Sequence, residues 1–343
     1  MKIVIDSGIP FIKGVFEQYA DVCYIPGVEI TNGDLLDADA LVVRTRTRCD
    51  EALLEGTAVK IIATATIGTD HIDFDFCKKA GIHVQNASGS NAGGVMNYVF
   101  SALYGSASRR AIRLDNMVIG IIGVGNVGRR VEEMATHLGF NVLKCDPPRA
   151  EAEGSYGFVP MDELLRESNI VTMHVPLNDS TRGMCDSDFF AKMQPGAFFI
   201  NAARGEIVDD DALIYSIPKL GPVIIDTWNN EPHVNQHLVE KVDIATPHIA
   251  GYSYQGKQNA TAAVVRAVAR YFSISGLFDY FPETDPDSGP IKLDLKRMSQ
   301  GQVTSAFQYN YPIFTDDFLF RLNPSDFEKL RLEYSYRREF FIE

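Results

Sequence analysis

The chain has 343 residues, of which 45% are hydrophobic and 22% charged, so it is long enough for two or three packed domains and too apolar to be disordered. Its 45 acidic and 32 basic side chains give a net charge of −13. A field of that sign repels phosphate backbones and anionic lipids, so neither nucleic acid nor a membrane is an expected partner. A small anionic substrate is compatible with this charge, because a few arginines can reverse the potential inside one cleft.

The five cysteines are widely spaced and include no C-x-x-C pair, a pattern of neither a disulfide framework nor a zinc site. We therefore expect reduced thiols and no metal. Asp6 and Pro10 interrupt the first apolar run before it could form a secretion signal, and no later stretch approaches the roughly 20 apolar residues that span a bilayer. These features predict a cytoplasmic protein.

Short β-branched runs alternate with segments of helical period from residue 1 to about residue 250. Near-continuous apolar strands of this kind are typical of parallel sheets covered by helices on both faces. The expected fold class is therefore α/β, with Rossmann-like, doubly wound parallel sheets. In chain order, the expected strands contain residues 3–5, 40–43, 60–63, 118–122, 142–143, 170–173, 197–200, 223–225 and 242–244.

Two such sheets are expected, because one strand–helix series ends near residue 90 and another begins at Met117. Apolar residues at helical spacing predict a long helix within residues 91–113 that joins the domains. A second long helix, from about Tyr254 to Phe272, would return the chain to the first domain. The expected units are a discontinuous domain of residues 1–92 and 254–280, a second domain of residues 93–253, and a C-terminal module of residues 281–343.

The C-terminal module follows a proline-, glycine- and acid-rich linker at residues 282–290. It is too short to build a large core alone, yet it is rich in aromatic residues. We favour a small α+β module that buries these aromatics against a second copy of the chain; the alternative is an appendage packed on its own subunit. The residues concerned are Phe318, Phe320, Phe327, Tyr334, Tyr336, Phe340 and Phe341.

A glycine fingerprint of the form G-x-G-x-x-G follows the expected strand at residues 118–122 and opens a helix. Gly123 permits a tight turn, Gly125 lets backbone approach a pyrophosphate, and Gly128 allows close contact between helix and strand. Asp146 ends the next strand, about 20 residues further on, where a carboxylate accepts hydrogen bonds from a ribose. This context favours a dinucleotide site over a glycine-rich turn without a ligand.

The expected cofactor is NAD, because the carboxylate of Asp146 would repel the additional phosphate of NADP. Arg149, three residues further on, is the one residue that argues for NADP. The intervening Pro147 and Pro148 could direct its side chain elsewhere.

Three ionisable residues follow later strands: Arg204, Glu231 and His248. Loops after the carboxyl ends of parallel strands open onto the crevice where ligands bind. His248 is the candidate base for oxidation of an alcohol, Glu231 could orient its other ring nitrogen, and Arg204 could bind a substrate carboxylate. Each residue also has a plainer structural explanation: His248 could cap a helix, Glu231 could be a carboxylate at a helix start, and Arg204 could form a surface ion pair. Because all three follow a nucleotide-binding fingerprint in the same chain, the catalytic interpretation is favoured.

These motifs resemble those of the D-isomer-specific 2-hydroxyacid dehydrogenases, in which the glycine fingerprint precedes N-x-x-R-G, D-x-x-x-x-E-P and P-H-I-A/G-G segments. The resemblance covers nearly the whole chain. It is strongest to the members that use NAD to oxidise 4-phospho-D-erythronate to (R)-3-hydroxy-2-oxo-4-phosphooxybutanoate in pyridoxal phosphate synthesis, although the C-terminal dimerisation domain of those members usually runs further. The matching segments are residues 42–47, 63–71, 123–130, 145–149 and 246–252.

The resemblance implies a homodimer in which the first domain binds substrate and closes as a lid over the NAD-binding second domain. It also implies a substrate site that includes Thr45, Thr66 and Tyr252, to which the charge of Arg44 adds a further candidate. The implied cofactor site comprises Gly123, Gly125, Asn126, Val127, Gly128, Asp146, Val175, Asp226 and Gly251.

Arg44, Arg46 and Arg48 alternate along an otherwise uncharged strand end. On an extended strand these cations would share one side, as binding of a phosphorylated substrate requires; a solvated strand edge is the plainer alternative. Two other functions stay open: oxidation of another D-2-hydroxy acid such as 3-phosphoglycerate, and NAD-dependent sensing by a non-catalytic protein of the same fold that binds protein partners.

Overall fold

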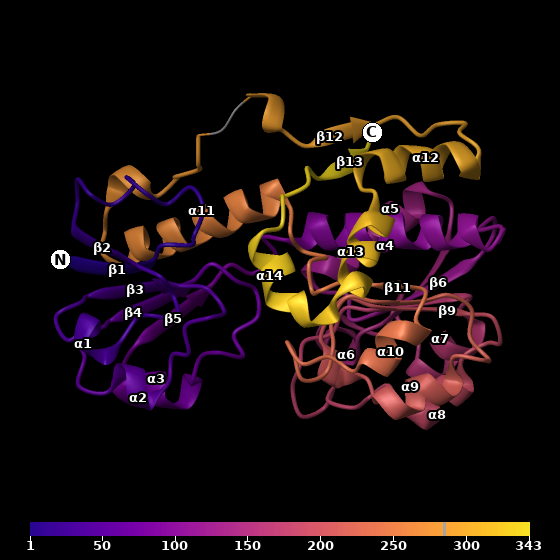
Figure 1. Ribbon diagram of the computed structural model, residues 1–343, viewed down its shortest axis with the longest axis horizontal. Coiled ribbons are helices and arrows are strands. Elements are labelled where there is room, and N and C mark those ends of the chain that lie inside the picture. The colour runs from indigo at the N-terminus through magenta and orange to yellow at the C-terminus, as the bar shows by residue number, and fades with distance from the viewer. Residues whose placement is uncertain (284–285) are drawn as a thin grey trace. The chain divides into compact units, whose positions relative to one another are not determined.

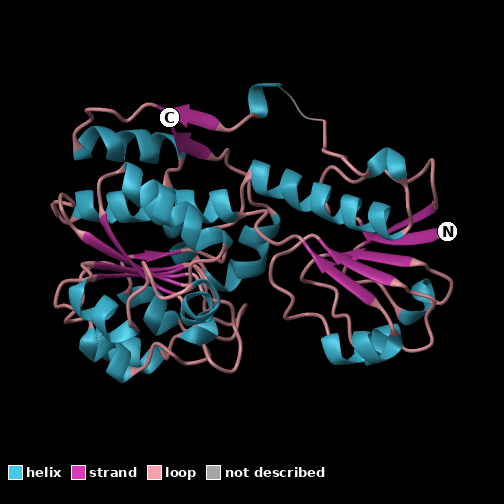
Figure 2. Ribbon diagram, turned by 180° about the vertical axis from the view of Figure 1, so that it is seen from behind, coloured by secondary structure: helices cyan, strands magenta, loops and turns pink. Residues whose placement is uncertain are grey.

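The computed structural model describes residues 1–283 and 286–343, and this part of the chain divides into two compact units. The first unit contains residues 1–91 and 254–289, and the second contains residues 92–253 and 290–343. Each unit is built around its own parallel sheet with helices on both faces (Figures 1 and 2).

The first unit has five parallel strands in the order β2-β1-β3-β4-β5. Helix α11 packs on one face through Val264, Val265 and Val268, and the short helices α1, α2 and α3 cover the other (Figure 1). The elements are β1 (Lys2–Asp6), β2 (Asp21–Ile25), α1 (Asn32–Leu35), β3 (Ala40–Val43), α2 (Glu51–Leu54), β4 (Ile61–Thr64), α3 (Phe74–Ala80), β5 (His83–Asn86), α11 (Tyr254–Tyr271), η2 (Ser275–Leu277) and η3 (Pro286–Ser288).

The second unit has six parallel strands in the order β7-β6-β8-β9-β10-β11. The strand order reverses between β6 and β8, so a ligand crevice is expected at their carboxyl ends. The core elements are α4 (Ala92–Arg109), β6 (Val118–Ile122), α5 (Asn126–His137), β7 (Asn141–Cys145), α6 (Pro147–Glu153), α7 (Met161–Glu167), β8 (Ile170–Met173), α8 (Ser187–Lys192), β9 (Phe198–Asn201), η1 (Gly205–Ile207), α9 (Asp210–Ser216), β10 (Val223–Ile225), α10 (Gln236–Lys241) and β11 (Ile244–Ala245).

Short polar residues determine where several helices of this unit begin. The side chains of Asp186, Asp209 and Asn235 accept hydrogen bonds of 2.9, 3.0 and 3.3 Å from backbone amides in the first turns of α8, α9 and α10. Such caps satisfy amides that have no partner inside the helix. They fix the ends of the loops that follow the strands.

The C-terminal segment packs on both faces of the second unit. It consists of β12 (Ile291–Leu293), α12 (Gln300–Asn310), α13 (Ile313–Leu322), η4 (Pro324–Asp326), α14 (Phe327–Leu332) and β13 (Phe340–Ile342), in which β12 and β13 pair in parallel. Phe320 and Phe327 are fully buried on the face that contains Trp228, and the Phe320 ring lies 5.8 Å from the Trp228 ring. Phe340 is buried against α4, where the side chain of Asn97 donates to its carbonyl (2.7 Å) and accepts from its amide (3.0 Å).

The packing corrects one expectation from the sequence. Phe320, Phe327 and Phe340 are buried within their own chain, so the prediction that they await a second copy is wrong for these three. Phe318 remains 60% exposed, and Phe341 is 37% exposed.

The α/β class, the two parallel sheets and the nine expected strands are confirmed. In the two large sheets, two strands were missed, β2 and β5, which are the edges of the first sheet and carry polar residues that conceal the apolar pattern. The short strands β12 and β13 of the C-terminal segment were not located from the sequence either. The strand before Arg44 ends at Val43 and residues 45–47 form a turn, so the argument that alternate arginines share one side of a strand is wrong. Among the described residues, no helix is long and apolar enough to cross a bilayer.

Replacement of Phe320 by alanine tests the packing of the C-terminal segment. We expect Phe320→Ala to lower the free energy of unfolding by about 3–5 kcal/mol, because it leaves a cavity beside Trp228. The control, Tyr215→Ala on α9, should change it by less than about 0.5–1 kcal/mol because that ring is 87% exposed. Trp228 is the only tryptophan, so its fluorescence reports this region during denaturation; equal effects of the two substitutions would contradict the packing.

Candidate active site

Three neighbouring strands carry the three candidate catalytic residues beyond their carboxyl ends. Arg204 follows β9, Glu231 follows β10 and His248 follows β11, and these strands are adjacent and parallel. The first two loops touch at Gly205, where an added Cβ would lie 1.9 Å from the carbonyl carbon of Trp228. Only glycine allows this approach, which brings the Arg204 loop against the loop that leads to Glu231.

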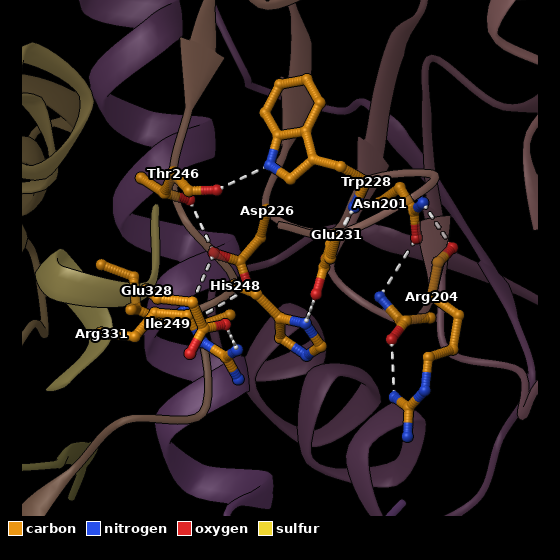
Figure 3. Close-up of polar contacts among 12 residues, drawn as sticks. Asn201, Arg204, Asp226, Trp228, Glu231, Thr246, His248, Ile249, Glu328 and Arg331 are labelled. Carbon is orange, nitrogen blue, oxygen red and sulfur yellow. Dashed lines mark hydrogen bonds and ion pairs between the residues drawn. The ribbon is translucent and has the colours of Figure 1, made fainter. Parts of the chain in front are cut away.

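His248 and Glu231 form a direct pair. The His248 Nδ1 lies 2.8 Å from Glu231 Oε2, and the backbone amide of Trp228 donates to Glu231 Oε1 at 2.9 Å (Figure 3). The two side chains are 30% and 22% exposed, so the pair is partly shielded from water. Because a carboxylate only accepts, Nδ1 carries the proton in this pair, and Nε2 is the nitrogen left to accept a proton from a substrate.

A buried carboxylate holds the backbone of the His248 loop. Asp226 is fully buried and accepts hydrogen bonds from the Thr246 hydroxyl (2.7 Å) and from the amides of Ile249 and Ala250 (2.9 Å each; Figure 3). His248 itself has a φ of +56°, in the left-handed region that side chains rarely adopt. These bonds support that conformation and aim the imidazole at Glu231.

Arg337, from the C-terminal segment, binds the backbone carbonyl oxygens of the same loop. Arg337 Nη1 donates to the carbonyls of Ile249 (3.1 Å) and Tyr252 (3.0 Å), and Nη2 donates to the carbonyl of Ala250. The guanidinium carbon also lies 3.9 Å from the centre of the Tyr311 ring, a cation–π contact. Two backbone amides of the loop thus donate hydrogen bonds to Asp226, and three of its carbonyl oxygens accept hydrogen bonds from Arg337.

Burial and charge act in opposite directions on the two carboxyl groups. Burial alone would raise the pKa of Glu231, but the charge and hydrogen bond of His248, the Trp228 amide and the charge of Arg331 lower it overall. Burial raises the pKa of Asp226 above its usual range, although His248 and the donors of the loop oppose that shift. Glu231 is therefore suited to remain ionised beside a protonated imidazole.

Arg204 extends from the loop after β9. Its Nη1 donates to the carbonyl of Ala203 at 2.8 Å, and the Asn201 side chain braces the turn by donating to the Arg204 carbonyl (2.9 Å) and accepting from the Ala203 amide (3.1 Å). In Figure 3 its guanidinium and the imidazole of His248 extend toward the same part of the view. The structure thus places the third candidate on the same edge of the sheet.

The glycine turn has the expected backbone. Gly123 has a φ of +85°, and a Cβ there would lie 2.7 Å from the His174 carbonyl; a Cβ on Gly128 would lie 2.1 Å from the Gly123 oxygen. At Gly125, by contrast, an added Cβ would meet nothing within 4 Å, so open space lies at the start of α5. Asn126 and Val127 form the first turn of that helix. This cradle at a helix N-terminus fits a pyrophosphate.

The residues around Asp146 favour NAD. Asp146 accepts from the amides of Val124 (2.7 Å) and Arg149 (3.1 Å), and its oxygens keep further lone pairs for ribose hydroxyls. The Arg149 guanidinium is bound by Glu153 at 2.6 and 2.8 Å and by the Val124 carbonyl at 2.7 Å. It is thus already neutralised by a carboxylate, as expected if the prolines direct it away from a ribose phosphate.

The remaining candidate cofactor residues flank these two regions. Val175 follows β8, and a Cβ on Gly123 would also lie 2.8 Å from its amide nitrogen, so this residue lies beside the glycine turn. Gly251 lies in the His248 loop, between Ala250 and Tyr252. Both carboxylate oxygens of Asp226 accept hydrogen bonds from other residues of the chain, so this residue positions the His248 loop, a role that the sequence did not reveal. Its expected contact with NAD stays a prediction.

The candidate substrate residues of the first unit are arranged differently from expectation. Arg44 is paired with the buried Asp6 at 2.8 Å, and the exposed Arg48 pairs with Asp50 at 2.9 Å. Thr45 is exposed, and the hydroxyl of Thr66 donates to the Gly68 carbonyl at 2.8 Å. The expected row of two or three phosphate-binding cations is therefore not formed by these arginines.

Tyr252, the fourth candidate, lies in the second unit against aromatic residues of the C-terminal segment. Its ring centre is 5.9 Å from that of Tyr334 and 6.3 Å from that of Tyr336, and the Arg331 guanidinium carbon is 5.8 Å from the ring. Sequence reasoning missed Arg331 and Arg337 as neighbours of the site, because no spacing pattern links them to residues some 80–90 positions earlier.

Comparisons with known proteins agree with this geometry. Residues 97–250 match the family model described as "D-isomer specific 2-hydroxyacid dehydrogenase, NAD binding domain". An erythronate-4-phosphate dehydrogenase of Bacteroides fragilis is 42% identical over 99% of this chain and 97% of its own length. One from Yersinia enterocolitica is 38% identical over 99% of this chain and 93% of its own length.

The chain belongs to the D-isomer-specific 2-hydroxyacid dehydrogenase family. Solved structures support the fold: an NAD⁺-bound 3-phosphoglycerate dehydrogenase of Entamoeba histolytica has a TM-score of 0.69 at 26% identity, over 81% of this chain and 97% of that one. A D-lactate dehydrogenase of Aquifex aeolicus has a TM-score of 0.65 at 24% identity, over 82% of this chain and 98% of that one. As in this family, NAD is the cofactor of the chain.

The pair of His248 and Glu231 predicts a pH-dependent contribution to stability. Because the pKa of Glu231 is lower in the folded chain, its contribution is fully present above the unfolded value of about 4.3 and is lost as the pH falls through the lower folded value. We expect the stability difference between the wild type and Glu231→Gln to shrink as the pH falls below about 4.3. Urea denaturation at pH 5, 4 and 3 measures it; a difference that stays constant or grows below about pH 4.3 would contradict the pair.

Proposed function

We propose that this chain is the NAD-dependent dehydrogenase that oxidises 4-phospho-D-erythronate to (R)-3-hydroxy-2-oxo-4-phosphooxybutanoate, a step of pyridoxal phosphate biosynthesis. The similarity over nearly the whole chain to proteins named erythronate-4-phosphate dehydrogenase supports this substrate. The observation that carries the chemistry is the hydrogen bond between His248 and Glu231 at the carboxyl edge of the sheet that also bears the glycine turn.

His248 acts as the general base. Its Nε2 takes the proton of the C2 hydroxyl, and Glu231 stabilises the imidazolium that forms because a carboxylate already accepts from Nδ1. NAD, when bound, accepts the hydride that leaves C2. In the reverse direction the protonated ring returns its proton to the oxygen of the keto acid.

Arg204 binds the substrate carboxylate. A planar guanidinium can contact both oxygens of a carboxylate and polarise the neighbouring C2 oxygen. The residues that hold NAD are the backbone of residues 123–128 at the start of α5, which takes the pyrophosphate, and Asp146, which takes the ribose hydroxyls.

The enzyme is also proposed to act as a homodimer in the cytoplasm. Exposed apolar side chains gather on the C-terminal segment, where Phe318 is 60%, Leu319 44% and Leu322 65% exposed on α13. This surface, rather than the buried aromatics, would contact the second copy. The first unit would then serve as the lid over substrate.

The proposed reaction is tested by following NADH absorbance. Wild-type enzyme should oxidise 4-phospho-D-erythronate with NAD, and His248→Asn should lower kcat by about 10²- to 10⁴-fold because the base is lost. The control is His237→Asn, an exposed histidine on α10, which should leave kcat unchanged.

The outcomes separate the competing functions. Preference of the wild type for 3-phosphoglycerate in a panel of D-2-hydroxy acids would replace the proposed substrate. Tight binding of NADH with no turnover of any acid would favour a sensor protein over an enzyme. A His248→Asn variant as fast as His237→Asn would overturn the mechanism.

A further inference from the structure

The active site contains a second guanidinium, which comes from the C-terminal segment. Arg331 lies in α14, one turn after the fully buried Phe327, and its guanidinium carbon is 5.5 Å from the Phe327 ring. Phe327 in turn packs on Phe320, with ring centres 5.9 Å apart, and Phe320 packs on Trp228. This column of rings joins α14 to the loop that carries Glu231 and sets the position of Arg331.

Several observations place the Arg331 charge beside the catalytic pair. The guanidinium carbon lies 5.8 Å from the Tyr252 ring, and the charge of Arg331 is one of the groups that lower the pKa of Glu231. In the view of Figure 3, the guanidinium groups of Arg331 and Arg204 appear on either side of the His248 imidazole. The two cations come from different elements, Arg331 from α14 and Arg204 from the loop after β9.

Arg331 also has hydrogen-bonding capacity to spare. Its side chain is only 17% exposed; Nη1 donates to Glu328 Oε1 at 3.2 Å, while the buried Nε has no hydrogen-bond partner among the described residues. An unpaired buried donor on a charged group costs free energy unless a ligand satisfies it. A dianionic phosphate is the ligand best matched to a fork of guanidinium donors, and it carries more charge than the single carboxylate of Glu328.

Two of the three arginines expected to bind phosphate are already paired with carboxylates. Arg44 is held by the fully buried Asp6, and Arg48 by Asp50, while Arg46 is exposed. In the second unit, Arg204 is assigned to the substrate carboxylate, and Arg331 is a further, largely buried cation for the opposite end of a four-carbon acid.

We propose that Arg331 binds the 4-phosphate of the substrate and determines the preference for a phosphorylated acid. This inference rests on the proposed function and names its phosphate subsite. It makes the C-terminal segment a part of the active site of its own chain, with Arg204 and Arg331 holding the two ends of the substrate while the C2 hydroxyl meets His248.

The test compares two substitutions on the same helix. Arg331→Met removes the proposed phosphate contact, and Lys329→Met removes an exposed positive charge two residues away. For 4-phospho-D-erythronate we expect Arg331→Met to raise KM by about 10- to 100-fold, as the loss of a charged hydrogen bond does. For unphosphorylated D-erythronate its kcat/KM should stay within about twofold of the wild type, and Lys329→Met should change neither substrate by more than about twofold.

A binding measurement provides a readout that does not depend on turnover. Calorimetric titration of 4-phospho-D-erythronate into enzyme saturated with NADH should give a Kd about 10- to 100-fold weaker for Arg331→Met. If that variant does not fold, Arg331→Lys decides, because it keeps the charge but loses the fork; KM for the phosphorylated acid should rise about 3- to 10-fold and the other substrate should be unaffected.

The results distinguish the subsite from the proposed function. Failure of the wild type to oxidise 4-phospho-D-erythronate would overturn the proposed function. Normal wild-type activity, with Arg331→Met and Arg331→Lys indistinguishable from Lys329→Met in KM and Kd, would overturn the subsite alone. Equal losses on the phosphorylated and unphosphorylated acids would also overturn it, since they would indicate a general structural role.

Discussion

The backbone of residues 246–252 is largely buried but belongs to no helix and no strand, so its polar groups must find partners outside regular structure. Asp226 takes the amides of Ile249 and Ala250, and Arg337 takes three carbonyls of the same loop. These two side chains hold the loop in which His248 adopts its left-handed conformation and its ring reaches Glu231. The geometry of the proposed base depends on this support.

The C-terminal segment therefore does more than extend the fold. Its rings fill both faces of the second unit, its Arg337 supports the catalytic loop, and its Arg331 adds a positive charge near the catalytic pair. A chain with a net charge of −13 needs such local cations to attract an anionic hydroxy acid. Because Arg331 and Arg337 come from the C-terminal segment, substitutions in that segment can change the charge near the catalytic pair without altering the parallel sheet.

Much of the second unit could be predicted because its signals are local. The apolar strands, the glycine turn and the acid after β7 follow one another in the sequence, and the order of parallel strands then brings Arg204, Glu231 and His248 to one edge. The partners of these residues could not be predicted in the same way. Asp6 ends β1 and Arg44 directly follows β3, two strands that are neighbours in the sheet but not in the sequence, and Arg337 reaches the His248 loop only through tertiary packing.

The most direct test of this account is the tautomer of His248, measured by NMR of enzyme labelled with ¹⁵N at its seven histidines and assigned with the His248→Asn variant. The account predicts that the neutral ring carries its proton on Nδ1 and leaves Nε2 free, and that Glu231→Gln weakens this preference. A neutral ring protonated on Nε2 in the wild type would contradict it, because that nitrogen could then accept no proton from a substrate.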